Sequence, residues 1–588
     1  MTLRQFARSW PFAAENELQQ NGGRQPSRAA LTDLVRPSST PIRRPAFDGW
    51  TLATAAIAAV IAIPVLVVLS YVLVPTGDIW LHLASTVLPT YVANTLWLMV
   101  GVGLGTLTIG TGTAWLVTLH RFPGRDLLQW MLLLPMAVPG YVIAYTYGGM
   151  MDFAGPVQSG LRALFGWRHG DYWFPQIRSL GGAVAILTFV LYPYVYLLAR
   201  AAFTEQSVCV LEASRTLGAG PWRRFFRVGL PLARPAVVAG VALALMETLN
   251  DLGAVQHFAV DTFTTGIFRT WFGMGQPAAA AQLAAVLLIF VVVLLLLERW
   301  SRGDARYHQT SLRYRALPSL RLKGIKGALA LVACAMPIVL GFAVPLGVLV
   351  WWAIRSQALG FDARFLKLAF NSVSLGAIAA ALAVFLSLVL AYGARLRPTP
   401  LVRTLVRLAS TGYAVPGAVI AVGVMLPFAA IDRTIDAWAR ASFGVSTGLI
   451  FSGTIVAVTF AYLVRFLAIS FNAAEASLAK VGRSMDDAGR VLGRRPHEVL
   501  ATIHLPLLRP SLLAAALLVF VDVIKELPAT LILRPFNFDT LAIYAYDLAR
   551  NEQLAETAAP ALAILAAGLG PVILLARSIG RSRPGHAL

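Results

Sequence analysis

Twelve long apolar segments recur along the sequence, and they constrain its fold more than any other feature. Each is close to the ~20 residues that an α-helix needs to cross about 30 Å of hydrocarbon. Inside a bilayer the backbone must satisfy its own hydrogen bonds, so such segments form helices. They cover residues 51–74, 91–118, 128–150, 181–202, 235–253, 278–297, 328–354, 370–394, 405–431, 448–471, 510–530 and 558–576. We therefore expect an all-α polytopic membrane protein with about 12 transmembrane helices.

The composition supports this fold class. Charged residues make up only 13% of the 588 residues, where a soluble domain has about 25%. Hydrophobic residues make up 57%, and the mean hydropathy is +0.69. Such a chain has too few polar residues to cover a soluble core.

The net charge of +21 has two explanations, a nucleic-acid partner or the positive-inside rule. If the N-terminus is cytoplasmic and the spans alternate, 37 of the 49 basic residues fall in cytoplasmic segments. Membrane orientation then explains the charge, and no nucleic-acid partner is expected. We predict a multi-pass protein of the cell inner membrane with cytoplasmic N- and C-termini. The polar residues 1–50 lack a signal-peptide pattern and are expected to form a cytoplasmic arm.

Several catalytic sites are excluded by the residues present. No lysine follows a glycine, so there is no phosphate-binding GxxxxGK[ST] loop, and no HExxH zinc motif occurs. Cys209 and Cys334 lie too far apart in the sequence to suggest a metal site or a disulfide framework. Gly101, Gly103 and Gly105 lie inside an apolar run, where close helix packing is expected. We predict no catalytic residues, no cofactor and no fixed metal in this chain.

The second half of the sequence repeats the first at an offset of 275 to 277 residues. The matches include Gly218 with Gly493, Leu230-Pro231 with Leu505-Pro506, Pro139-Gly140 with Pro416-Gly417, and Asn94 with Asn371. Six spans separate the copies, so the two repeats have the same orientation. We expect two parallel six-helix repeats, 51–300 and 328–580, joined by a basic cytoplasmic linker, 301–327, and followed by a tail, 581–588. A pathway between them would follow a pseudo-two-fold axis along the membrane normal.

Each repeat carries a long loop on the basic face, at about 205–234 and 475–509, between its fourth and fifth spans. Each loop is predicted to form a short helix, a turn at Gly218 or Gly493, and a second helix that ends at Leu-Pro. Glycine permits a sharp turn, and proline can open the next helix. Either the loop is a docking surface, or duplication simply copied two ordinary short helices.

The loop spacing E-A-A-x3-G-x9-[I/V]-x-L-P resembles the EAA loop of importer-type ABC transporter permeases. Asp487 in place of Glu, and Ser214 or Gly489 in place of the second Ala, are departures. By this resemblance each loop is a coupling helix that sits in a groove of an ATP-binding cassette ATPase subunit, and its arginines meet that partner. The matching residues are Glu212, Ala213, Gly218, Val228, Leu230 and Pro231, and Asp487, Ala488, Gly493, Ile503, Leu505 and Pro506.

Four further segments, 247–253, 261–271, 525–530 and 534–542, resemble the ferric-iron (Fe3+) permease family with two fused halves. The resemblance covers roughly residues 50–580. It implies a periplasmic ferric-binding protein as partner and ATP hydrolysis in a separate ATPase, expected in two copies. Thiamine permeases share the fused architecture and are an alternative. An ion-coupled secondary transporter is an alternative of another class, but it leaves the two EAA-like loops unexplained.

Acidic residues near the ends of two spans are the candidate substrate path. Glu247 and Asp251 are one helical turn apart, and Asp522 and Glu526 are their counterparts in the second repeat. Ionisable groups in a span are costly and usually face a cavity or a partner. Oxygen-rich clusters suit hard cations. The alternative is a structural role in ion pairs with Lys525 or Arg534, and Tyr544 and Tyr546 are weaker path candidates.

Overall fold

The computed structural model describes residues 49–168, 170–206, 214, 216–302, 320–356 and 362–581. The chain divides into two units, Met1–Gly49 and Trp50–Leu588. The predicted N-terminal arm therefore lies almost entirely outside the described residues, as do most of the linker and the tail.

The described residues are almost entirely helical, as predicted. In this part of the chain 11 helices are long and apolar enough to cross a membrane, and a bent pair would make 12. The main helices of the first repeat are α2 (Gly49–Ser70), α4 (Leu88–Leu119), α5 (Arg125–Met131), α6 (Gly140–Met151), α8 (Leu180–Glu205), α11 (Leu230–Asn250) and α14 (Pro277–Arg302). Those of the second are α15 (Ile325–Ile338), α16 (Val344–Arg355), α17 (Ala363–Leu396), α18 (Pro400–Ala409), α19 (Gly417–Phe443), α20 (Ile455–Ala479), α23 (Leu505–Ile524) and α26 (Ala558–Arg581).

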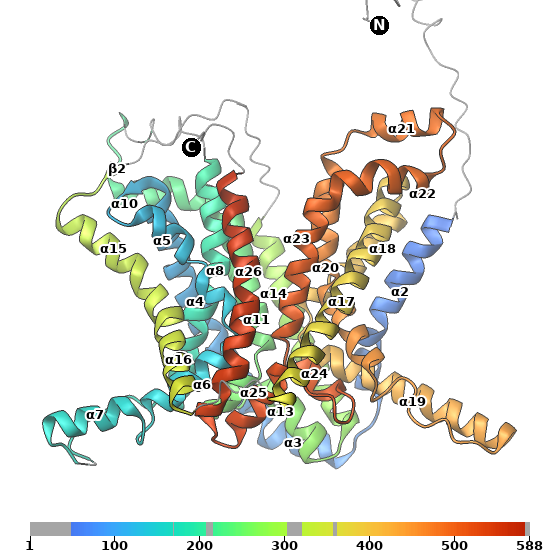
Figure 1. The fold of residues 1–588 in the computed structure, drawn as a ribbon, viewed down its shortest axis with the longest axis horizontal. Helices are drawn as coiled ribbons and strands as arrows, with labels where there is room; N and C mark the ends of the chain where they lie inside the picture. Colours follow the sequence, from blue (N-terminus) through green and yellow to red (C-terminus); the bar gives the residue numbers. More distant parts are fainter. Residues whose placement is uncertain are drawn as a thin grey trace, which may run out of the picture. The chain divides into compact units, whose positions relative to one another are not determined.

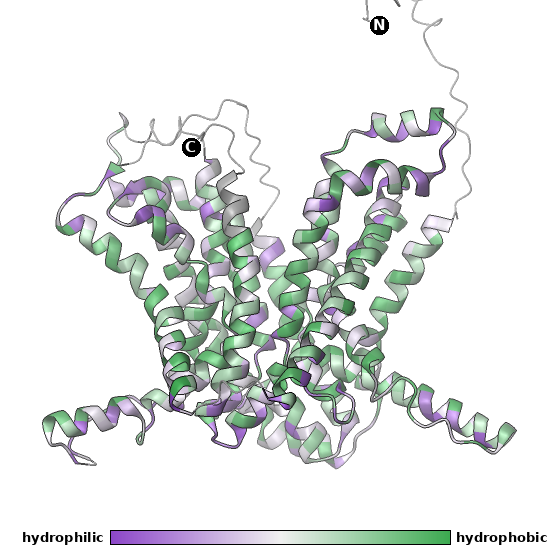
Figure 2. Ribbon diagram, in the orientation of Figure 1, coloured by the Kyte–Doolittle hydropathy of each residue, from purple (hydrophilic) through white to green (hydrophobic). Residues whose placement is uncertain are grey.

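Shorter elements connect these helices. They are α3 (Asp78–Thr86), α7 (Pro156–Phe165), α10 (Pro221–Arg224), α12 (Gly253–His257), α13 (Phe263–Phe268), α21 (Arg483–Val491), α22 (Pro496–Val499), α24 (Pro528–Leu533) and α25 (Leu541–Arg550). Two strands of two residues, β1 (His120–Arg121) and β2 (Leu320–Arg321), pair in parallel. Figure 2 shows hydrophobic residues along the long helices and hydrophilic residues gathered at α10, α21 and α22.

The third predicted span, 128–150, is not one continuous helix. The segments Arg125–Ala137 and Gly140–Phe165 meet at 90°. Pro139 stands at the break; a proline offers no backbone N–H and favours an extended residue before it, so the first helix ends there. The ninth span breaks at the equivalent point, Pro416-Gly417, between α18 and α19. The Pro-Gly pairs identified as a repeat are therefore the breaks themselves.

The repeat seen in the sequence is also present in the structure. Asn94 donates from Nδ2 to the carbonyl of Asp261 at 2.9 Å, and Asn371 donates in the same way to Asp539 at 3.0 Å. The predicted close packing of glycines is present as well: a Cβ at Gly101 or Gly105 would approach Val184 or Thr188 of α8 to 2.7 and 2.5 Å.

The first helix of each repeat packs against the other repeat, which the sequence repeat does not indicate. A Cβ at Gly423 of α19 would come within 2.2 Å of the Pro64 carbonyl oxygen in α2. In the opposite direction, Tyr147 of α6 donates to the carbonyl of Leu340, next to α15, at 2.8 Å. In Figure 1, α2 runs beside α17 and α18, and α15 runs beside α4 and α5. The two sequence halves are therefore interlocked rather than independent bundles.

Candidate substrate cavity and coupling loops

The spans α11 and α23 each end at an acidic residue that caps a short helix. An Asp251 carboxylate oxygen accepts the N–H groups of Ala254 and Val255 at 2.9 and 3.1 Å. A Glu526 carboxylate oxygen accepts the N–H of Ala529 at 3.2 Å. The first backbone N–H groups of a helix lack partners within it, so these carboxylates start α12 and α24.

A cavity of about 90 Å³ lies where the two repeats meet, and all four predicted carboxylates line it. Helices α6, α8 and α11 contribute from the first repeat, and α20 and α23 from the second. The polar and charged side chains on its wall are Tyr141, Tyr194, Glu247, Asn250, Asp251, Arg465, Asp522, Lys525 and Glu526. The offset between the repeats was therefore sufficient to predict that these acids meet.

Each carboxylate in this cavity has a partner within the protein, and two of them share one arginine. Arg465 lies 3.6 Å from Glu247 and 3.4 Å from Glu526. Lys525 pairs with Asp522 at 2.7 Å. Within the described residues, no group of three or more acidic, histidine or cysteine side chains has a geometry that could hold a metal ion. In this conformation the acids are engaged by protein cations and helix N–H groups.

Arg465 is the main residue of the site that sequence reasoning did not identify. It was counted with the cytoplasmic basic residues, but it lies in the middle of α20 and is only 3% exposed. An arginine flanked by apolar residues in a span is itself a signal of a buried partner. Arg534, suggested as a partner of the cluster, pairs instead with Asp539 and, at 3.7 Å, with Asp547.

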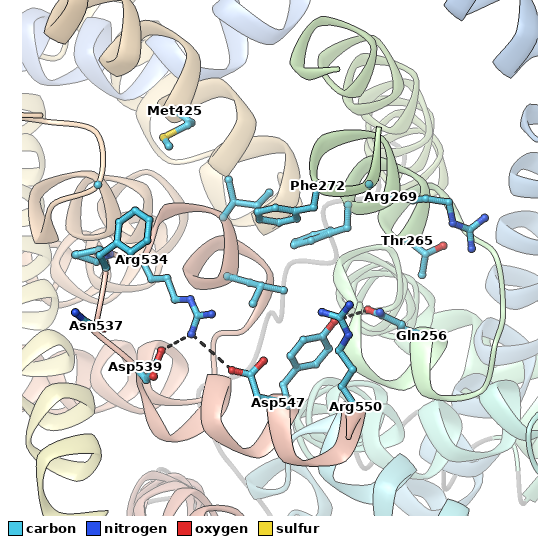
Figure 3. A pocket seen from close by; sticks show the side chains of 18 of the residues that line it. Gln256, Thr265, Arg269, Phe272, Met425, Arg534, Asn537, Asp539, Asp547 and Arg550 are labelled. Atoms are coloured by element: carbon cyan, nitrogen blue, oxygen red, sulfur yellow. Dashed lines mark hydrogen bonds and ion pairs between the residues drawn. The ribbon is translucent and has the colours of Figure 1, made fainter. Parts of the chain in front are cut away.

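A larger cavity of about 1080 Å³, here called the vestibule, lies on the other side of α12 and α24. Figure 3 shows side chains from both repeats on its wall, among them Gln256, Arg269, Arg534, Asp547 and Arg550. Tyr546 also lines it and donates to Gln256 at 2.8 Å. Burial raises the pKa of Asp547, while the neighbouring Arg534 acts in the opposite direction. Tyr544 contacts Arg364, whose guanidinium lies 4.7 Å from the ring centre.

The short helices α12 and α24 separate the two cavities. Leu252 and Leu527 line the small cavity just before them, whereas Gln256 and Leu531, one turn further along, line the vestibule. Leu252 and Leu527 are both buried. The two short helices therefore stand between the vestibule and the small cavity.

The second loop has the predicted order of short helix, glycine turn and second helix, namely α21, Gly493 and α22. In the first loop the turn at Gly218 is followed by α10, and most of the segment before it lies outside the described residues. Gly218 and Gly493 both have φ of +74°, a conformation that L-residues rarely adopt. Pro231 and Pro506 lie in the first turn of α11 and α23. Asp487 and Ala488 are exposed on α21, whereas Glu212, Ala213 and Arg215 lie outside the described residues. Large apolar side chains are exposed beside the turns at Leu217, Trp222, Val491 and Leu492.

The departure at Gly489 has a structural reason. A Cβ at this position would come within 2.7 Å of Val499 in α22, so glycine permits α21 to pack closely on the second helix of the loop. Sequence reasoning also missed Asp486, the residue before the motif. Its side chain is buried and contacts His504 at 2.6 Å and Arg395 at 2.8 Å.

Comparison with known proteins agrees with this architecture. Residues 106–303 match the family described as binding-protein-dependent transport system inner membrane component. The chain is 30% identical over 205 residues to the molybdenum transport system permease protein ModB of Escherichia coli, covering 86% of that protein and 34% of this chain. The chain belongs to this family of permeases.

Two further relatives differ in how much they cover. The Fe(3+)-transport system permease protein FbpB 2 of Haemophilus influenzae is 26% identical over 487 residues, which is 82% of this chain and 88% of that protein. The sulfate transport system permease protein CysT of Escherichia coli is 37% identical over 146 residues, 25% of this chain and half of that protein. Of these relatives, FbpB 2 matches this permease across both of its repeats, and ModB and CysT match it across a shorter part. Its family rules out the secondary transporter considered above.

Proposed function

We propose that this permease imports ferric iron, which a periplasmic binding protein delivers and a separate ATPase drives across the membrane. The observation that carries the proposal is the small cavity between the repeats, lined by Glu247, Asp251, Asp522 and Glu526. The similarity to an Fe(3+)-transport permease over both repeats supports the same substrate.

The charge of the cavity favours a cation over the oxyanions named for other relatives. Four carboxylates face two cationic side chains, which leaves two formal negative charges on its wall. Molybdate and sulfate are anions and would be repelled in a site of low dielectric, where charges interact strongly. Carboxylate oxygens are the ligands that hard cations prefer.

The coupling loops and the cavity are linked by continuous helices. Each loop runs through its Leu-Pro pair into α11 or α23, and these helices of 21 and 20 residues end at the acidic cluster. Such a helix is about 30 Å long. A movement of the loop imposed by the ATPase is thus transmitted to α12 and α24. Two loops imply two ATPase subunits, one for each loop.

We also infer that the repeats comprise 51–300 and 328–580 and that both termini are cytoplasmic. The support is the distribution of basic residues and the position of both coupling loops on one face of the span pattern.

The test of the proposed function is uptake by the complete transporter. Reconstituted vesicles with the ATPase and the binding protein should accumulate radiolabelled ferric iron when ATP is supplied, and excess molybdate, sulfate or thiamine should not compete. Glu247→Gln combined with Asp522→Asn should lower uptake per transporter at least about tenfold. Asp126→Asn, a neutralisation of an exposed acid, is the control and should transport normally.

Two outcomes would contradict the proposal. ATP-driven uptake of an oxyanion or thiamine in place of iron would reject the substrate. Normal specific uptake by the double variant would reject the role of the acids in the path. A melting curve on the same samples separates a path role from a purely structural one, because a structural role predicts lower thermal stability together with lower uptake.

A further inference from the structure

Arg465 joins the two repeats across the small cavity. Its Nη1 donates to Oδ1 of Asn250 at 2.5 Å, and its Nη2 lies 3.6 Å from Oε2 of Glu247. Both partners belong to α11 of the first repeat, while Arg465 belongs to α20 of the second. The same Asn250 oxygen accepts the N–H of Gly417, at the break before α19, at 2.6 Å. The end of α11 is therefore held to two elements of the other repeat.

This connection has no equivalent in the opposite direction. At the offset of 275 residues, Arg465 corresponds to Val190 and Lys525 corresponds to Asn250. Val190 and Asn250 line the same cavity, so both of its cations come from the second repeat. Lys525 pairs with Asp522 of its own helix. Of the two cations in this cavity, Arg465 is the one whose ion pairs include an acid of the other repeat.

The surroundings of Arg465 are incompletely satisfied. Its Nε has no hydrogen-bond partner within the described residues, although the side chain is almost fully buried. Tyr141 also lines this cavity, and its buried hydroxyl has no partner in the same part of the chain. The site thus contains two buried polar groups whose hydrogen-bonding capacity is not used in this conformation.

We propose that Arg465 is a tethered cation that holds the two repeats together across the closed path, and that a cationic substrate opens the path by competing for Glu247 and Glu526. This rests on the proposed function, because it requires a cation as substrate. A trivalent ion offers both carboxylates more charge than one guanidinium. In the absence of such an ion, separating the repeats would leave buried charges unpaired, which is costly. The path would then open only when its substrate is present.

Access to the small cavity tests this directly, independently of uptake. Met136 lines the cavity and is partly exposed, so Met136→Cys provides a reporter thiol. It is placed in the full chain with Cys209→Ser and Cys334→Ala, assembled with the ATPase in right-side-out vesicles. The rate of reaction with a small, membrane-impermeant thiol reagent added outside reports how often the path opens. Ga3+, kept soluble by nitrilotriacetate, is the redox-inert probe, and the chelator alone is its control.

Arg465→Gln should raise the labelling rate at least about tenfold. Lys525→Gln removes a cation from the same cavity but breaks an ion pair with Asp522 of its own repeat, and should change labelling less than about twofold. Ga3+ should accelerate labelling of the Arg465-containing protein and have little further effect on Arg465→Gln. If Arg465→Gln does not assemble, Arg465→Gln with Glu247→Gln removes the connection while leaving fewer unpaired charges.

Unchanged labelling in Arg465→Gln, or an equal rise in Lys525→Gln, would overturn the connection between the repeats. A rise in Arg465→Gln without any response of the Arg465-containing protein to Ga3+ would overturn the competition by a cation. Failure of the proposed function is distinguishable, because a transporter of another solute would show no iron uptake whatever its labelling rate.

Discussion

At the scale of single residues, the two coupling loops differ in how they are held. In the second loop, the buried Asp486 binds His504, just before α23, and Arg395, at the end of α17. Arg395 also donates to the carbonyl groups of Leu478 and Val481 at 2.5 and 2.8 Å. At the repeat offsets, His504 corresponds to Gly229 and Arg395 to Thr118. Gly229 instead faces Trp115, which a Cβ would approach to 2.3 Å. The second loop is thus held by the charged side chains of Asp486 and Arg395, whereas at the equivalent point of the first loop Gly229 packs against Trp115.

Asp486→Asn should destabilise the second coupling loop by about 3 kcal/mol, because it leaves the largely buried Arg395 guanidinium without its carboxylate. Burial alone would raise the pKa of Asp486, but the hydrogen bonds from His504 and Arg395 outweigh it, so the pKa lies below its usual value of 3.8. A carboxylate whose pKa is lower in the folded state than in the unfolded state stabilises the fold at pH values above the unfolded-state pKa. This contribution is lost only as the pH falls through the folded-state pKa. The difference in hydrogen exchange of residues 483–504 between Asp486→Asn and the unchanged protein should therefore be the same at pH 7 and at pH 5.

Asp487→Asn, in an exposed neighbour, is the matched control and should leave exchange unchanged. If the difference in hydrogen exchange between Asp486→Asn and the unchanged protein is already lost at pH 5, the pKa of Asp486 is not lowered and the prediction is wrong.

At the scale of elements, the turn within each coupling loop depends on backbone conformation rather than on space. Gly218 and Gly493 share a φ of +74°, and nothing lies within 4 Å of a Cβ built on either residue. A bulky side chain would therefore not clash there. An L-residue is nevertheless disfavoured, since the left-handed region costs it roughly 1–2 kcal/mol. Asparagine tolerates this region better than other residues.

Gly493→Ala and Gly218→Ala should each reduce iron uptake and co-purification of the ATPase, while the chain still inserts into the membrane. Gly493→Asn is the matched control and should retain more of both, although its side chain is larger. Pull-down of the ATPase from solubilised membranes, together with uptake per transporter, measures the effect. If the alanine variants retain full uptake and assembly, or asparagine is worse than alanine, the conformational role of these turns is wrong.

At the scale of the whole molecule, the exchange of first helices between repeats makes the fused chain one cooperative unit. Helix α2 packs on α19, and the α15–α16 segment packs beside α6 and α8, with Gly341 as a close contact of the Phe189 carbonyl. The paired strands β1 and β2 add a further link between the repeats. Six predicted spans separate the two candidate coupling loops, which places both on one face of the span pattern, and that face is the one we assign to the cytoplasm.

This orientation predicts the reactivity of introduced cysteines. Leu217, beside the first glycine turn, is 87% exposed, and Trp173, in the connection after α7, is 86% exposed. In a chain without Cys209 and Cys334, Leu217→Cys should react with an impermeant thiol reagent only in inside-out vesicles. Trp173→Cys should react only in right-side-out vesicles. The reverse pattern would invert the topology, and the two positions serve as controls for each other.

The sequence by itself determined the helical membrane fold, the repeat and the glycine turns of the two candidate coupling loops, because each depends on local properties. Span length, charge distribution and the spacing around Gly218 and Gly493 can be read from neighbouring residues. The repeat offset also predicted that Glu247 and Asp251 meet Asp522 and Glu526. Residues at equivalent positions of two symmetry-related repeats lie at the same distance from the axis between them. The sequence could not show that 128–150 and 405–431 are broken at Pro139 and Pro416, because an apolar segment has the same length whether it bends or not.

Only the tertiary structure decided which residues face one another across the repeats. The apolar residues around Arg465 signal a buried partner but do not identify it, and only the packing of α20 places Arg465 beside Glu247 and Asn250 of the other repeat. The partners of Asp486 lie 91 and 18 residues away, and the packing of α2 on α19 spans hundreds of residues. Such pairings depend on how helices pack around each other, and a nearly uniform apolar surface contains little local information on which neighbour it will meet.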